Sequence, residues 1–224
     1  MKKTASKFVL AVLAVASFTA CKKNSETVID TANNGSFRVF TQGNVTTVQN
    51  LQGDTIIGLS SLGQPFGSGK YTFFSLVNGT LVSNSDSATT KWDIGIRGTT
   101  ILTNAGTSGP GAGGAFVQVG LFSDLTTISN DSTFRTDNVP TYAITTGSNK
   151  GWYVYDGATN LVNPIPGRVL VIRTANGKYA KMEINSYYRG GVTPPATATD
   201  AIKTSEQRYF TFRYTYQADG TKKF

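Results

Sequence analysis

Residues 109 to 114 have the spacing of a dinucleotide-binding fingerprint. The stretch GPGAGG matches G-x-G-x-x-G through Gly109, Gly111 and Gly114. In such a site a strand precedes the glycines and a helix follows them, because the helix N-terminus receives the pyrophosphate. Here ILT precedes the glycines, but the following AFVQVGLF is alternating and β-branched, which predicts a strand. We therefore interpret the stretch as a glycine-rich connection between two strands.

Few other residues have the types and spacing that catalysis requires. The sequence contains no histidine, which removes Ser-His-Asp and Cys-His catalysis and the commonest ligand of transition metals. The acidic residues are isolated, and no D-x-D or E-x-x-E cluster suggests a metal cage or the carboxylate pair of a glycosidase. We expect a protein that is not an enzyme and has no catalytic residues.

The single cysteine, Cys21, follows an export signal. A segment with three lysines precedes an apolar run at residues 8–18, which is too short to cross a bilayer as a helix. The stretch FTAC resembles a bacterial lipobox, although Phe18 stands where leucine is usual. We expect residues 1–20 to be a lipoprotein signal peptide and Cys21 to carry the lipid, with palmitate as an acyl chain. The alternative is ordinary secretory cleavage that leaves the thiol free.

The charge pattern does not predict a nucleic-acid partner. The formal net charge is +8, but three of the 21 basic residues belong to the signal, which leaves 18 basic against 13 acidic residues and a charge of +5. These residues are scattered and form no run longer than a pair. Residues 21–35 are polar and lack aromatic side chains, so we expect a flexible tether there and one domain over residues 36–224.

Strand signals dominate the rest of the chain and predict an all-β fold, a single antiparallel β-sheet domain of many short strands. Asn78-Gly79 and Asn176-Gly177 each predict a hairpin with a two-residue turn, the first of type I′. The second turn would pair Val171 with Met182 and place Met182 on an apolar, core-facing stripe. No window outside the signal has an apolar 3.6-residue period with caps, so no helix is expected.

Aromatic residues are the other chemical resource of the sequence. In GWYVY, Trp152 and Val154 would face one way and Tyr153 and Tyr155 the other. The segment is either a strand at the edge of the core or a flat aromatic wall for a planar or sugar-like ligand.

Two further aromatic strands are expected to build the core. Trp92 would be buried, with Ile94 and Ile96 alternating on its face. The closing strand RYFTFRYTYQ alternates, so that one face carries Phe210, Phe212, Tyr214 and Tyr216.

Three stretches resemble the HmuY family of haem-binding outer-membrane lipoproteins. They are KWDIGIRGTTILTNAGTSGPGAGGAF (91–116), RVLVIRTANGKYAKMEINSYY (168–188) and RYFTFRYTY, within a match over roughly residues 37–217. The resemblance implies an all-β domain that serves iron acquisition. Such a domain captures haem from host proteins and delivers it to a TonB-dependent outer-membrane receptor. In those relatives two axial His or Met side chains hold the iron.

This sequence departs from the family at the iron ligands. It has no histidine, and apart from the initiator its only methionine is Met182. Tyrosine ligation of ferric iron remains, or a porphyrin held by stacking and basic residues. By position, the family's ligand loops fall near residues 135–165. We expect Tyr142, alone in the segment VPTYAI, to be the metal ligand, and the other ligand-binding residues to be Trp152, Tyr153 and Tyr155, with Arg135, Lys150 or Arg168 for the propionates.

The sequence leaves two alternatives to haem binding. The same scaffold would bind a siderophore, a glycan or a peptide, or the chain would be a structural or adhesive surface lipoprotein without a small-molecule site. In each case we expect attachment to the outer membrane through lipid on Cys21, with the periplasmic face and the cell surface both open.

Overall fold

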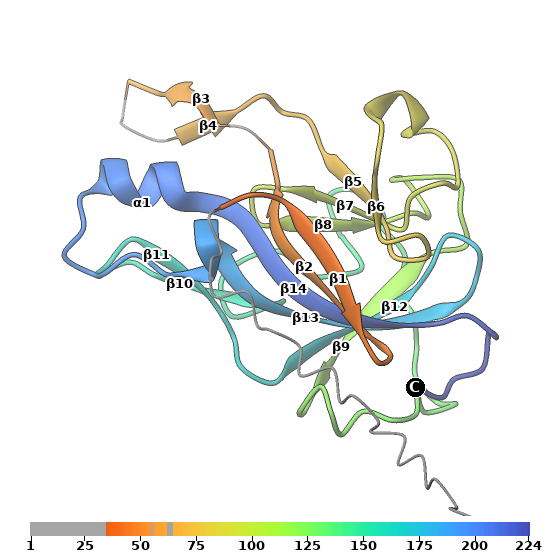
Figure 1. The fold of residues 1–224 in the computed structure, drawn as a ribbon. Helices are drawn as coiled ribbons and strands as arrows, with labels where there is room; N and C mark the ends of the chain where they lie inside the picture. Colours follow the sequence, from red (N-terminus) through yellow and green to blue (C-terminus); the bar gives the residue numbers. More distant parts are fainter. Residues whose placement is uncertain (1–34, 55, 62–64) are drawn as a thin grey trace, which may run out of the picture.

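The computed structural model describes residues 35–54, 56–61 and 65–224. The expected signal peptide, Cys21 and nearly all of the tether lie outside these residues. The described strands form antiparallel sheets, which confirms the all-β prediction (Figure 1).

Two sheets make up most of the domain. The six-stranded sheet has the order β1-β2-β14-β13-β12-β9 and the four-stranded sheet the order β6-β5-β7-β8. The strands of the first are β1 (Arg38–Gln42), β2 (Val45–Gln52), β14 (Gln207–Gln217), β13 (Tyr179–Tyr188), β12 (Arg168–Arg173) and β9 (Gly114–Val119). Those of the second are β6 (Thr80–Val82), β5 (Thr72–Ser75), β7 (Ile94–Arg97) and β8 (Thr100–Thr103).

Smaller elements flank these sheets. Two two-stranded sheets are formed by β3 (Ile56–Leu59) with β4 (Pro65–Gly67), and by β10 (Tyr153–Asp156) with β11 (Leu161–Pro164). The helical elements are η1 (Asn84–Asp86), η2 (Arg189–Gly191) and α1 (Asp200–Glu206). In Figure 1 the β3–β4 hairpin and α1 lie close together at one end of the domain.

The main core combines side chains of both large sheets. The predicted alternation of β14 is confirmed, because Phe210, Phe212 and Tyr214 are buried in this core and Tyr216 packs against it. The ring of Phe74 on β5 meets the Phe212 ring edge-on, with the centroids 5.8 Å apart.

The β12–β13 hairpin has a register one residue away from the prediction. The backbone N–H of Thr174 donates to the carbonyl of Lys178, so the turn has three residues and ends on Gly177 at φ 80°. Met182 therefore pairs with Leu170 and not with Val171. Met182 is nevertheless fully buried, which confirms its expected place in the core.

The β5–β6 hairpin also forms as expected, but its turn is longer than predicted. Ser75 pairs with Thr80, so four residues lie in the loop and the two-residue type I′ turn at Asn78-Gly79 is wrong. The backbone N–H of Gly79 donates to the Ser75 carbonyl at 2.9 Å.

Trp92 is fully buried, as predicted, but on the other side of its sheet. It precedes β7 and packs against Phe73, with the ring centroids 4.5 Å apart, whereas Ile94 and Ile96 belong to the main core. Gly95 gives the Phe73 ring its space, because a Cβ there would lie 2.9 Å from that ring. The predicted shared face of Trp92, Ile94 and Ile96 is therefore wrong.

The short helix α1 was not expected from the sequence. Thr199 caps it by accepting the backbone N–H of Ile202, and Asp200 lies in its first turn. Seven residues are too few to show a helical period, and the local capping pattern is its main signal. Among the described residues, no helix has the length and hydropathy required to cross a membrane.

Candidate functional site

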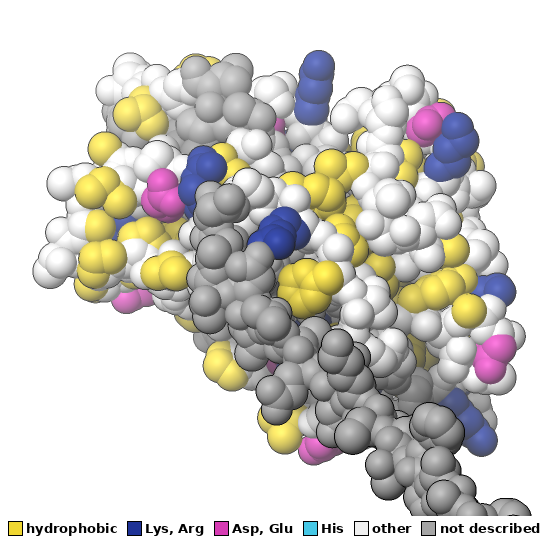
Figure 2. Space-filling view, viewed as in Figure 1, with side chains coloured by type: hydrophobic (Ala, Val, Ile, Leu, Met, Phe, Trp, Pro, Cys, Tyr) yellow, Lys and Arg dark blue, Asp and Glu magenta, His cyan; other side chains and the backbone are white. Residues whose placement is uncertain are grey.

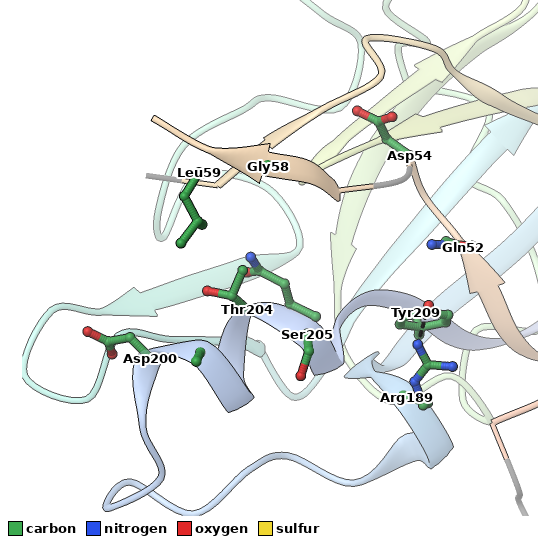
Figure 3. A pocket seen from close by; sticks show the side chains of 11 residues that line it. Gln52, Asp54, Gly58, Leu59, Arg189, Asp200, Thr204, Ser205 and Tyr209 are labelled. Carbon is green, nitrogen blue, oxygen red and sulfur yellow. Dashed lines mark hydrogen bonds between the residues drawn. The ribbon is translucent and has the colours of Figure 1, made fainter. Parts of the chain in front are cut away.

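A groove of about 520 Å³ opens between β3 and α1 (Figure 3). Its volume lies within the range of roughly 300–1,000 Å³ that is usual for small-molecule sites. It is lined by Gln52, Asp54, Gly58, Leu59, Arg189, Asp200, Ala201, Thr204, Ser205, Gln207 and Tyr209.

Strand pairing accounts for the floor of the groove. Gln52 at the end of β2 is paired with Tyr209 near the start of β14. Gln207 and Tyr209 are two residues apart on β14, and both line the groove. The intervening Arg208 is hydrogen-bonded to the buried Tyr187 hydroxyl. The floor is thus built from the ends of two central strands.

Arg189 and Tyr209 form the polar end of the groove. The guanidinium carbon of Arg189 lies 3.9 Å from the Tyr209 ring centroid, and an Arg189 N–H donates to the Tyr209 hydroxyl oxygen (Figure 3). The same guanidinium is 3.5 Å from the carboxylate of Glu206. The positive charge of Arg189 at this end of the groove attracts a ligand carboxylate.

The other end of the groove is open and mostly apolar, with the Asp200 carboxylate at the start of α1. Leu59 is 57% exposed and faces α1 across the groove (Figure 3). Ala201 and Thr204 on α1 lie opposite. In Figure 2 hydrophobic side chains appear across the face in view, this end of the domain included, whereas Lys and Arg are scattered singly. The groove thus offers apolar walls to a ligand with one polar or anionic end.

Trp152 and Tyr153 lie in the core, not on a wall open to a ligand. Trp152 is 2% exposed, and its indole N–H donates to the Thr99 carbonyl at 2.9 Å. The Tyr153 ring packs 5.0 Å from it, and Tyr155 is exposed and donates to the Asn160 side chain. The burial of Trp152 and Tyr153 therefore favours the core alternative for this strand.

Tyr142 is half-buried and lies outside the groove lining. It packs against the cluster of Phe73, Trp92 and Leu102. Its hydroxyl is hydrogen-bonded to that of Tyr71, and burial raises the pKa of Tyr71 above its usual value. Tyr142 thus joins a second aromatic cluster.

The structure brings one expected basic residue to Tyr142. The Arg135 guanidinium donates to the carbonyls of Tyr142 and Ala143 and to the Thr145 hydroxyl, and so holds this loop. Arg168 begins β12 and is paired with Val119 on β9. The expected set is therefore not gathered into one pocket.

The family-like stretch at residues 91–116 is mainly structural. The Asn104 amide donates to the carbonyls of Thr89 and Trp92, and its oxygen accepts the backbone N–H of Gly111 at 3.0 Å. A Cβ at Gly113 would lie 2.7 Å from the Asn104 carbonyl oxygen. The glycine-rich loop joins β8 to β9, as predicted, and its glycines let it wrap closely around Asn104.

Side chains that bind metals are sparse in the described part of the chain. No group of three His, Cys, Asp or Glu side chains could hold a metal ion there. The Met182 sulfur is fully buried in the core. Tyr209 places in the groove a phenol oxygen, which is a known ligand of haem iron.

Comparison with known proteins identifies the family. The family model described as HmuY protein matches residues 68–214, which is more than half of the chain. The chain belongs to the HmuY family. No curated protein matches the sequence.

Three crystal structures have HmuY-like or lipoprotein descriptions. A lipoprotein from Bacteroides fragilis has 17% identity and a TM-score of 0.49, over 83% of this chain and 96% of its own. An HmuY-like haem-binding protein from Bacteroides vulgatus has 14% identity and a TM-score of 0.45, over 77% and 92%. The apo HmuY analogue of Tannerella forsythia has 16% identity and a TM-score of 0.40, over 81% and 97%.

Proposed function

We propose that this HmuY-family protein is a non-enzymatic lipoprotein that binds haem in the groove between β3 and α1. The observation that carries the proposal is the groove itself, which combines apolar walls with the Arg189–Tyr209 pair at one end. A porphyrin has a flat apolar body and two carboxylates. Its body suits the space between Leu59 and α1.

The donor set favours ferric haem with a tyrosine ligand. Tyr209 supplies a phenol oxygen of the kind that ligates ferric haem iron, and an Arg189 N–H donates to that oxygen. His is absent from the chain and Met182 is buried, so the axial pairs expected for the family are not available here. Tyr142 stays a second candidate ligand, on the surface formed with Tyr71 and Arg97.

A second candidate is another ligand with a carboxylate, such as a siderophore, in the same groove. The Arg189 guanidinium, which lies 3.5 Å from the Glu206 carboxylate, would bind a ligand carboxylate whether or not a porphyrin carries it. The two candidates differ in whether a porphyrin ring is required.

We further propose that the protein is attached to the outer membrane through lipid on Cys21 and passes its ligand to a TonB-dependent receptor. The FTAC stretch and the family membership support this part of the proposal.

The experiment is an absorbance titration of the purified protein with ferric haem, in parallel with a variant whose groove is filled. Ala201 lies on α1 in the groove lining, so Ala201→Trp should abolish saturable binding. Ala218 is exposed beyond the end of β14, and Ala218→Trp is the matched control that should bind as the wild type does. Equal binding by both variants would place the ligand elsewhere.

A further inference from the structure

The β3–β4 hairpin forms one wall of the groove but is connected to the rest of the fold mainly at its neck. Among the described residues, its strands pair with each other and with no strand of another sheet. A two-stranded hairpin alone is at best marginally stable in water. Leu59 and Phe66 are largely exposed, so these two side chains contribute little to its attachment. Among the side chains that the structure describes, the contacts at the neck are therefore the main attachment of this wall.

An ion pair lies at that neck. Asp54 lies two positions before the start of β3, and its carboxylate is 3.6 Å from the guanidinium of Arg208 on β14. The side chains are 4% and 13% exposed, so water screens the pair only weakly. Ser68, which follows β4, donates to the other carboxylate oxygen of Asp54 at 2.6 Å. Asp54 thus joins both ends of the hairpin to the strand that carries Tyr209.

The backbone around the pair has an unusual conformation. Asp54 has φ 79° and Arg208 has φ 71°, in the left-handed region that is costly for arginine. A Cβ at Gly67 would overlap the Asp54 carboxylate and lie 2.6 Å from the Arg208 guanidinium. The backbone N–H of Gly53 donates to the Arg208 carbonyl at 2.7 Å. Strain and close packing thus coincide at this contact.

We propose that the Asp54–Arg208 pair is a positioning element that sets the distance between the β3 wall and Tyr209, and thereby selects ligands by size. The inference rests on the proposed function in one respect, that the groove binds a ligand. It extends that function to residues which need not touch the ligand.

The test uses Asp54→Asn in the full chain, because asparagine tolerates a left-handed backbone and still accepts from Ser68 while removing the charge. Glu183→Gln is the matched control, since it breaks the Arg213–Glu183 ion pair of 2.7 Å between β13 and β14. If Asp54→Asn does not fold, the double variant Asp54→Asn, Arg208→Gln removes both charges and leaves neither buried alone. On each folded variant we measure amide hydrogen exchange and the binding of two ligands. The ligands are ferric haem and the smaller anion anilinonaphthalenesulfonate.

We expect faster exchange at residues 56–61 in ligand-free Asp54→Asn, but not in Glu183→Gln. The affinity of Asp54→Asn for haem should fall about tenfold, which corresponds to 1.4 kcal/mol. Its affinity for the smaller anion should fall less. Unchanged exchange, or equal losses for both ligands, would overturn the positioning role. If the wild type does not bind haem, the proposed function fails, whereas exchange and the smaller anion still test this inference.

Discussion

One oxygen of the Asp93 carboxylate accepts the backbone N–H of Ala175 at 2.9 Å, and the other accepts that of Leu76 at 2.7 Å. The carboxylate, 2% exposed, therefore ties the β5–β6 turn and the β12–β13 turn to the start of β7. These turns belong to different sheets, so one buried side chain fixes the relative position of the two large sheets at this end of the domain.

Asp93→Asn should destabilise the protein without changing its fold. Asparagine keeps the shape but replaces one acceptor with an amide that faces a backbone N–H, which leaves a buried donor unpaired. We expect a loss of about 1–3 kcal/mol in the free energy of unfolding, measured by urea denaturation. A loss within error of zero would show that these hydrogen bonds do not contribute to stability.

The pH dependence of stability should report the same carboxyl. Burial raises the pKa of Asp93 above its usual 3.8, against hydrogen bonds from Ala175, Val77 and Leu76 that lower it. The folded protein therefore holds this proton more tightly than the unfolded chain does. The resulting stability is fully present below about pH 3.8 and is lost as the pH rises through the folded pKa.

The comparison that isolates this effect is wild type against Asp93→Asn. As the pH rises from about 3 to about 7, the free energy of unfolding of the wild type should fall relative to that of Asp93→Asn. If the free energy of unfolding of the wild type instead rises relative to that of Asp93→Asn over that range, the carboxyl has a lowered pKa in the folded state.

Trp92→Ala should be among the most destabilising single changes. The ring is fully buried against Phe73, and its indole N–H donates to the Ser87 carbonyl at 2.9 Å. We expect a loss of about 3–5 kcal/mol in denaturant melts. Val119 is 70% exposed, so Val119→Ala is a suitable control and should stay within about 0.5 kcal/mol of the wild type. A loss below about 1 kcal/mol for Trp92→Ala would contradict the burial of the ring.

The proposed lipid anchor is tested in cells. Cys21→Ala removes the thiol that the lipobox-like stretch would present for acylation. The protein should then move from the membrane fraction to the soluble periplasmic or secreted fraction, as seen by immunoblotting. An unchanged distribution of the variant would rule out Cys21 as the anchor.

Period-2 patterns and turn residues predicted the strands well because they depend on local chemistry. Phe210 and Phe212 on β14 and the fully buried Met182 are examples. The register around Asn176-Gly177 was missed because a three-residue turn ending on a left-handed glycine has nearly the same sequence signal as a two-residue turn. Trp92 was placed on the wrong face because the chain changes direction immediately before β7.

The groove was harder to predict than the fold. Its residues come from β2, β3, η2, α1, β14 and the connection between β2 and β3, which no local pattern links. Tyr209 carried one usable signal, since it lies on the face of RYFTFRYTYQ opposite to the core residues. Its pairing with Arg189, 20 positions away, depends on the β13–β14 register and on the β-bulges in it, which sequence alone did not specify.

We propose that Tyr209 ligates ferric haem in the groove, and the absorbance spectrum of the ferric complex is the decisive test. We predict a high-spin spectrum with a phenolate-to-iron charge-transfer band, which Tyr209→Phe abolishes and Tyr142→Phe leaves intact. Reduction should weaken binding, because Fe(II) is a poorer partner for an anionic oxygen. A low-spin spectrum of the wild type, or a band lost in Tyr142→Phe and kept in Tyr209→Phe, would contradict the account.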